Sequence, residues 1–176
     1  MHVLSSSEEA EFTALVQRQA HFAFRVAYAV LLNSHDAEDA VQETFLKLYR
    51  NGGWRNLGNE RAFLARVAWR VATDRRRRSV EPVGLDPGNY ADPPSPHPGP
   101  EQALLMANQH AVVHSMIDAL PEELRVPLVL SAFDELNSGE IGRILSIPEG
   151  TVRTRLQRAR QILRQKLAAV QENRYA

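Results

Sequence analysis

The sequence predicts an all-α protein of two small helical domains joined by a Pro-rich linker, with a helix-turn-helix in the C-terminal domain. Apolar residues recur at helical spacing on both sides of the linker, and no segment shows the alternation typical of a strand. Seven of the ten prolines lie in residues 81–101, EPVGLDPGNYADPPSPHPGPE, which excludes a helix or central strand there. The expected domains are therefore residues 1–80 and 102–176, with 81–101 as the linker.

Two helices are expected to open the N-terminal domain. Ser6 and Glu9 can cap the first, which is predicted to end near Asn33, and Ser34 or Asp36 starts the second. The inner face of the second helix is apolar. Its outer face presents Glu38, Asp39, Gln42, Glu43, Leu46 and Lys47. An exposed leucine among acids fits either a solvated face or a protein-docking surface.

A Gly-rich loop, NGGWRNLGNER (residues 51–61), precedes a third helix that ends in four consecutive arginines, Arg75 to Arg78. Aromatic and amide side chains in a loop beside a basic helix suit single-stranded nucleic acid, because bases stack on rings and phosphates bind cations. For Trp54 and Trp69, packing in the core is an equally good interpretation.

Residues 137–166 have the spacing of a helix-turn-helix. Asn137 and Glu140 form a capping box for the first helix, and Ser146 and Glu149 have the same spacing before the second. In the second helix the inward positions are Val152, Leu156, Ala159 and Leu163, and the outer ones are Arg153, Thr154, Arg155, Gln157 and Arg158. Such an outer row suits the major groove, although a solvated basic helix would look the same.

The zero net charge is the sum of large local charges of opposite sign. Residues 51–80 and 151–176 each carry a net charge of +6, whereas residues 1–50, 81–101 and 102–150 carry −3, −4 and −5. Two basic regions predict two separate contacts with a polyanion. The chain has no cysteine, no apolar run long enough for a membrane span and no signal-peptide pattern at its start, so we expect a cytoplasmic protein without membrane insertion.

An enzyme is not expected. His110 and His114 have the i, i+4 spacing of a zinc pair, but no catalytic glutamate lies between them, and they are interpreted as ordinary surface histidines. No Gly-rich loop that could hold a nucleotide phosphate is present. We therefore expect no cofactor, no metal and no small-molecule substrate.

Three segments taken together resemble the sigma-70 family, and the short layout resembles its extracytoplasmic-function (ECF) group. They are HDAEDAVQETFLKLYR (residues 35–50), RAFLARVAWRVATDRRRR (61–78) and the stretch from IDALPEELRVPL to RARQILRQKL (117–167). The resemblance implies a bacterial transcription initiation factor that binds core RNA polymerase and directs promoter recognition and DNA melting at the -10 and -35 elements. A stand-alone helix-turn-helix regulator is the alternative.

The resemblance also implies roles for individual residues. Contacts to the clamp of the polymerase β' subunit fall on Asp36, Asp39, Gln42, Glu43 and Leu46. Contacts to the -10 region fall on Trp54, Arg55, Asn56, Asn59, Arg61, Arg66, Arg70, Arg75, Arg76, Arg77 and Arg78. Contacts to the -35 region fall on Thr151, Arg153, Thr154, Arg155, Gln157 and Arg158.

Further implied partners are the polymerase β flap and an anti-sigma factor, and the linker is expected to run toward the RNA exit path. Which loop residue captures an unpaired base stays open. Gly139 and Gly142 depart from the family pattern, and at roughly 1 kcal/mol of helix propensity each they predict a softer -35 module.

Overall fold

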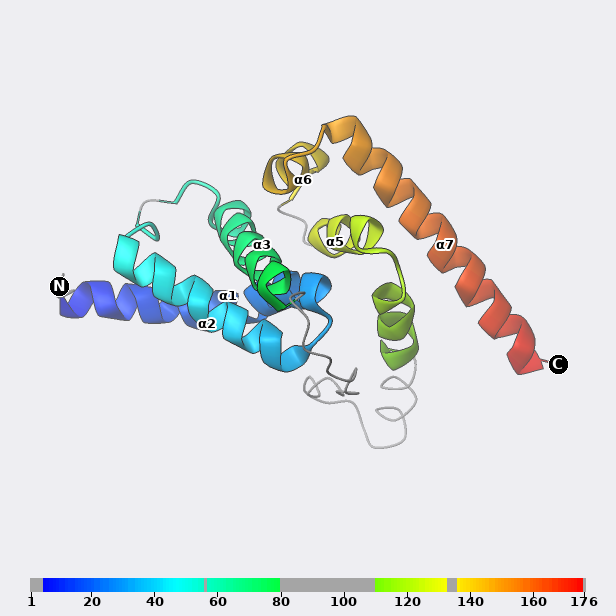
Figure 1. The fold of residues 1–176 in the computed structure, drawn as a ribbon, viewed down its shortest axis with the longest axis horizontal. Helices are drawn as coiled ribbons and strands as arrows, with labels where there is room; N and C mark the ends of the chain where they lie inside the picture. Colours follow the sequence, from blue (N-terminus) through cyan, green and yellow to red (C-terminus); the bar gives the residue numbers. More distant parts are fainter. Residues whose placement is uncertain (1–4, 56, 80–109, 133–135, 176) are drawn as a thin grey trace.

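The computed structural model describes residues 5–55, 57–79, 110–132 and 136–175, and these are built from helices joined by short turns (Figure 1). The helices are α1 (Ser6–Leu31), α2 (Ser34–Asn51), α3 (Glu60–Ser79), α5 (Glu122–Ser131), α6 (Ser138–Leu145) and α7 (Glu149–Tyr175). A further helical segment spans 110–118. The predicted all-α class is confirmed, whereas the predicted linker lies outside the described residues.

The starts of α1 and α2 follow local capping, and α1 differs from the prediction. Ser5, not Ser6, caps α1: its side chain accepts from the Glu8 backbone N–H, and the Glu8 carboxylate accepts from the Ser5 backbone in return. Ser5–Glu8 and Ser6–Glu9 both have capping-box spacing, so spacing alone could not choose between them. Asn33 caps α2, its side chain accepting from the Asp36 N–H at 2.9 Å.

The N-terminal half is a three-helix unit in which α1 packs against both α2 and α3. A polar tie reinforces the α1–α3 contact. Arg18 donates twice to the Glu60 carboxylate, at 3.0 and 2.6 Å, and Gln19 donates to it at 2.6 Å. The hydrogen bonds from Arg18 lower the pKa of Glu60, because they stabilise its charged form.

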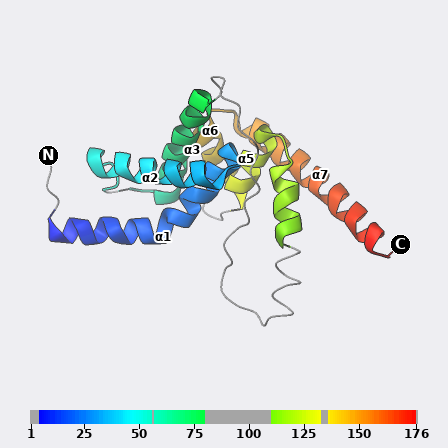
Figure 2. The same ribbon diagram turned by 60° about the horizontal axis from the view of Figure 1, so that its bottom comes forward.

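The predicted helix-turn-helix is α6 followed by α7. Asn137 and Glu140 form the expected capping box at the start of α6. Ser146 does not cap α7: it ends α6 in the left-handed conformation, at φ 57°, and its N–H bonds to the Gly142 carbonyl. In Figures 1 and 2 α7 extends well beyond the rest of the molecule toward the C-terminus.

Gly142 has a packing reason that its helix propensity hides. A Cβ built on it would lie 2.7 Å from the Ile147 carbonyl oxygen, closer than real Cβ contacts come. A side chain here would push against the backbone of the turn, so glycine lets the turn fold back on α6. At Gly139 a Cβ would meet only side-chain atoms, the nearest being Asn137 Oδ1 at 3.3 Å. The propensity argument therefore applies to Gly139 and not to Gly142.

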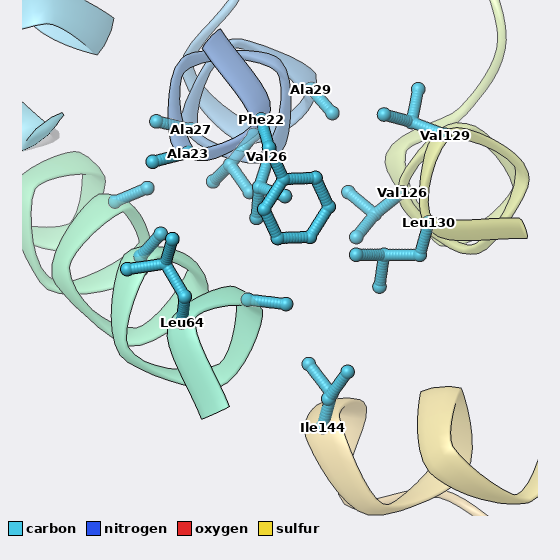
Figure 3. Close-up of a cluster of buried hydrophobic side chains, with 14 of the residues drawn as sticks. Phe22, Ala23, Val26, Ala27, Ala29, Leu64, Val126, Val129, Leu130 and Ile144 are labelled. Atoms are coloured by element: carbon cyan, nitrogen blue, oxygen red, sulfur yellow. The ribbon is translucent and has the colours of Figure 1, made fainter. Parts of the chain in front are cut away.

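The two halves share one hydrophobic core (Figure 3). Phe22 and Val26 of α1 face Val126 and Leu130 of α5, and Ile144 of α6 points into the same space. Leu64 of α3 and Val129 of α5 belong to the same cluster. All of these side chains are at most 9% exposed. We call this set the shared core. It joins α1 and α3 to α5 and α6, so the described halves pack against each other.

Arg125 of α5 is the polar centre of this packing. It is 5% exposed and donates to three backbone carbonyls: Ala29 at 2.7 Å, Asp118 at 3.1 Å and Leu120 at 2.6 Å. Ala29 lies in the last turn of α1, which has no basic residue of its own there. Carbonyls at a helix C-terminus lack partners within the helix and attract cations. Leu32 caps the end of α1 in the left-handed conformation, and Arg125 adds from the C-terminal half a cationic partner for a carbonyl of the last turn.

Further polar contacts cross between the halves. Tyr28 donates to Asp118 at 3.3 Å, and Arg76 forms an ion pair with Glu122. Burial raises the pKa of Asp118, an effect that the Tyr28 hydrogen bond and the charge of Arg125 oppose.

Candidate nucleic-acid and polymerase interfaces

The exposed face of α7 carries the residues predicted to read duplex DNA. Val152 and Ala159 are fully buried, Leu156 is nearly so and Leu163 is partly buried, which confirms the predicted inner face. The side chains of Arg153, Thr154, Gln157 and Arg158 are exposed, whereas those of Thr151 and Arg155 are partly covered. Arg153 pairs with Glu149 one turn earlier. The helix therefore presents a polar, basic row to solvent at the start of α7.

An open hollow lies between α7, the N-terminal end of α6 and the end of α5, with a volume of about 450 Å³. Its walls are Ser131, Leu136, Asn137, Ser138, Ile141, Arg153, Leu156, Gln157, Arg160 and Arg164. Arg160 and Arg164 are missing from the sequence prediction. The signal was available, because Arg153, Gln157, Arg160 and Arg164 follow the 4–3–4 spacing of one helix face.

The arginines in the second half of α3 divide into two groups. Arg70, Arg77 and Arg78 are exposed, as a phosphate contact requires. Arg75 and Arg76 instead pair with carboxylates of other elements: Arg75 with Asp39 and Glu43 of α2, and Arg76 with Glu122 of α5. The consecutive arginines therefore point in different directions, as the 100° step of a helix requires.

The structure places Trp54 in the hydrophobic core. It is 7% exposed and lies edge-on to Phe12, with ring centroids 5.3 Å apart. The Arg55 guanidinium lies over the indole ring, 5.1 Å from its centre, and forms an ion pair with Glu8 at 2.8 Å. This position supports the core-packing interpretation of Trp54, its contact with a base stays a prediction, and Arg55 holds the loop against α1.

The rest of the predicted -10 set lies at the start of α3. Asn59 accepts from the Ala62 N–H at 2.9 Å and so caps α3, and its amide donates to Glu140 of α6 at 2.7 Å. The Arg61 guanidinium lies 5.6 Å from the centre of the Phe22 ring, and Arg66 is half-buried. Asn56 lies outside the described residues. In this arrangement Glu140, from the C-terminal half, accepts a hydrogen bond from Asn59, a residue predicted to contact DNA.

The outer face of α2 carries the residues that are predicted to dock on the polymerase. Leu46 is 51% exposed, and Asp36 and Gln42 are also exposed. Tyr49, 38% exposed one turn beyond Leu46, extends the apolar part of this face. Asp39 and Glu43 are half-buried and already paired with Arg75, and Glu43 also pairs with Lys47 at 2.9 Å. The hydrogen bond from Lys47 is the main reason that the pKa of Glu43 is lowered.

The described residues contain no group of three His, Cys, Asp or Glu side chains that could hold a metal. His110 is exposed, and His114 Nδ1 lies 3.4 Å from the Arg25 guanidinium of α1. His114 thus belongs to the contact between the halves. Within the described part of the chain, no helix combines the length and apolar character needed to cross a bilayer.

Family models match both halves of the chain. The model for sigma-70 region 2 matches residues 15–80, which include α2, the Gly-rich loop and α3. The model for sigma-70 region 4 matches residues 110–163, which include α5, α6 and the exposed row of α7.

Curated proteins of similar sequence support the same family assignment as these two models. ECF RNA polymerase sigma factor SigW of Bacillus subtilis is 33% identical over 153 residues, covering 82% of each chain. The ECF RNA polymerase sigma-E factor of Escherichia coli K12 is 31% identical over 175 residues, covering 93% of this chain and 90% of its own. ECF RNA polymerase sigma factor SigE of Mycolicibacterium smegmatis is 36% identical over 156 residues, which are 88% of this chain but 60% of SigE.

Two solved structures share the fold. The sigma factor RpoE in complex with the anti-sigma factor NepR from Bartonella quintana superposes with a TM-score of 0.69 at 18% identity, covering 90% of this chain and 97% of RpoE. CnrH in complex with the cytosolic domain of CnrY has a TM-score of 0.60 at 23% identity, covering 92% and 90%. With the family models and the curated relatives, these findings show that the chain belongs to the ECF group of the sigma-70 family of RNA polymerase sigma factors.

Proposed function

We propose that this sigma factor binds core RNA polymerase through α2 and reads promoters with two separate surfaces, α7 at the -35 element and the loop with α3 at the -10 element. The observation that carries the proposal is the basic, exposed row at the start of α7, set on a helix-turn-helix whose inner face is buried. A second basic surface on α3 gives the other contact. The domain bounds 1–80, 81–101 and 102–176 follow this division.

The docking surface is the outer face of α2. Leu46 and Tyr49 offer an apolar patch, and Asp36, Gln42, Asp39 and Glu43 surround it with acceptors and an amide. A patch with an apolar centre and a polar rim is how protein interfaces are generally built. The β' clamp is the proposed partner, and the β flap is proposed to contact the C-terminal half.

On DNA, the start of α7 enters the major groove, where Gln157 and Arg158 meet base edges. Arg153 and the hollow that contains Arg160 and Arg164 fit phosphates of the flanking backbone. The exposed arginines of α3 hold the phosphates of the opened strand. Such contacts offset the few kcal/mol that unstacking a base requires. The chain shifts a melting equilibrium and performs no chemistry, so we propose that it is not an enzyme and acts in the cytoplasm, where the polymerase works.

Promoter binding requires the two halves to separate, because the amide of Asn59 and the guanidinium of Arg76 are engaged by Glu140 and Glu122. RpoE was solved in complex with the anti-sigma factor NepR, and CnrH with the cytosolic domain of CnrY. We propose that an anti-sigma factor likewise binds this chain and holds it away from the polymerase.

The test uses holoenzyme reconstituted from core polymerase and the full chain. Leu46→Ala should weaken binding to core, and Gln17→Ala, an exposed change on α1, should not. Gln157→Ala should reduce promoter affinity by about 1–3 kcal/mol and relax the preference at one -35 base pair. Gln165→Ala, two turns further along the same face of α7, is the matched control.

Wild-type affinity of Leu46→Ala for core would remove α2 as the docking surface. Equal promoter selection by Gln157→Ala and Gln165→Ala would remove the assignment of the -35 reader. If the free chain bound duplex promoters tightly without polymerase, a stand-alone regulator would explain the data better.

A further inference from the structure

Arg75 lies between two carboxylates that belong to the proposed polymerase-docking surface. Its Nη2 is 2.9 Å from Asp39 Oδ2 and its Nη1 is 3.3 Å from Glu43 Oε2. Both acidic residues are on α2, one turn apart, whereas Arg75 comes from the last part of α3. One guanidinium therefore bridges two successive acidic positions of the neighbouring helix.

This bridge neutralises both partners. Lys47 also pairs with Glu43, so the charges of Asp39 and Glu43 are matched by those of Arg75 and Lys47 within the chain. A basic partner surface thus meets a docking face whose acids are already occupied. Arg75 is equally occupied, while its neighbours Arg77 and Arg78 are exposed. The same contact withholds two acids from the polymerase and one cation from nucleic acid.

We propose that Arg75 is an exchange residue that couples polymerase docking to single-strand binding. When a basic surface of the polymerase takes Asp39 and Glu43, Arg75 is released and binds a phosphate of the opened DNA strand. The inference rests on the proposed function of α2 as the docking helix. It adds a mechanism by which docking strengthens the grip of α3 on DNA.

Thermodynamics makes this coupling reciprocal. If docking raises the affinity for single-stranded DNA by some factor, DNA raises the affinity for polymerase by the same factor. The factor is modest, because the Arg75, Asp39 and Glu43 side chains are 27%, 40% and 25% exposed and water screens pairs of this kind. Two such contacts correspond to about a two- to five-fold change in affinity.

The first measurement is the affinity of the full chain for core polymerase. Arg75→Gln should bind core about two- to five-fold more tightly than wild type, because Asp39 and Glu43 lose an internal competitor. Arg77→Gln is the matched control, since Arg77 is exposed and lies on the same helix. It should leave the affinity for core unchanged.

The second measurement is the salt dependence of binding to a short oligothymidylate, which reports the number of phosphates neutralised. The affinity falls as salt rises, so the slope of log K against log salt is negative, and its size counts the contacts. In holoenzyme, Arg75→Gln should reduce the size of this slope by about 0.7, the value for one single-strand contact. In the free chain it should leave the slope unchanged. Arg77→Gln should reduce the size of the slope in both. Conversely, the double variant Asp39→Asn with Glu43→Gln should make the slope of the free chain steeper, because it releases Arg75. Circular dichroism checks that each variant folds.

Weaker binding of Arg75→Gln to core would overturn the exchange and make Arg75 a residue that merely holds α2 in position. An equal change of slope in free chain and holoenzyme would also overturn it, because Arg75 would then contact DNA at all times. A different result would show that α2 is not the docking surface. In that case Leu46→Ala would bind core polymerase as tightly as wild type, whatever the effect of Arg75→Gln.

Discussion

Replacing Arg125 by methionine tests whether a single buried guanidinium holds the two halves together. Methionine keeps an unbranched stem of similar length but has no donors. Arg125 gives hydrogen bonds to the Ala29, Asp118 and Leu120 carbonyls, and the first of these joins α5 to α1. The variant leaves these carbonyls without their partner while the apolar contacts around the stem remain.

The magnitude follows from opposing terms. A hydrogen bond from a charged donor contributes about 1.5–3 kcal/mol, and an unsatisfied buried carbonyl costs about 1–3 kcal/mol. The burial of a charge opposes this stabilisation: it disfavours the charged form of the guanidinium and so lowers the pKa of Arg125. We expect a net loss of roughly 2–4 kcal/mol in the free energy of unfolding.

The assay is urea unfolding followed by circular dichroism, combined with hydrogen exchange of the last turn of α1 and of α5. Arg143→Met is the control, because Arg143 is exposed and donates a long hydrogen bond, 3.4 Å, to the Gly139 carbonyl within its own helix α6. Faster exchange at the contact between the halves should accompany the loss in stability. A change in stability no larger than that of Arg143→Met would show that Arg125 does not stabilise the closed packing.

Two further predictions concern the helix-turn-helix and pH. Gly142→Ala should destabilise the chain by about 1–3 kcal/mol in thermal unfolding, because the added Cβ would press on the Ile147 carbonyl. Gly139→Ala should be neutral or stabilising by up to about 1 kcal/mol. Equal effects of the two substitutions would contradict the close approach at Gly142. Asp118→Asn should stabilise the chain at pH 7, because burial disfavours the Asp118 charge and raises its pKa above 3.8. Protonation removes the same charge from the wild-type chain, so the stability advantage of Asp118→Asn should shrink as the pH falls through that raised pKa. Urea unfolding at pH 7 and pH 4 measures the difference in the free energy of unfolding. An advantage independent of pH would refute the electrostatic cause.

The features that the sequence predicts well are local. The helix periods, the Asn137–Glu140 capping box and the buried Val152 and Ala159 depend on residues within a few turns of one another. Where two local solutions compete, local information is insufficient. Ser146 has the spacing of a cap for α7, yet it ends α6 in the left-handed conformation because the turn folds back on Gly142.

The features that the sequence does not predict depend on partners far along the chain. Trp54 is buried against Phe12, 42 positions earlier, and the partners of Arg75 and Arg76 lie on α2 and α5. A run of four arginines shows a concentration of positive charge but not which guanidinium meets a carboxylate, since each step along the helix turns the side chain by about 100°. The shared core could not be predicted for the same reason.

The shared core also limits how tightly the chain can bind anything that needs its halves apart. If the open form is a small fraction of the free population, the observed affinity for an extended binding mode is reduced by that fraction. Phe22, Val26 and Leu130 are nearly inaccessible in the closed form, so opening exposes apolar surface to water unless a partner covers it. Mutations in this core far from any DNA contact can therefore raise or lower promoter occupancy by changing the population of the open form.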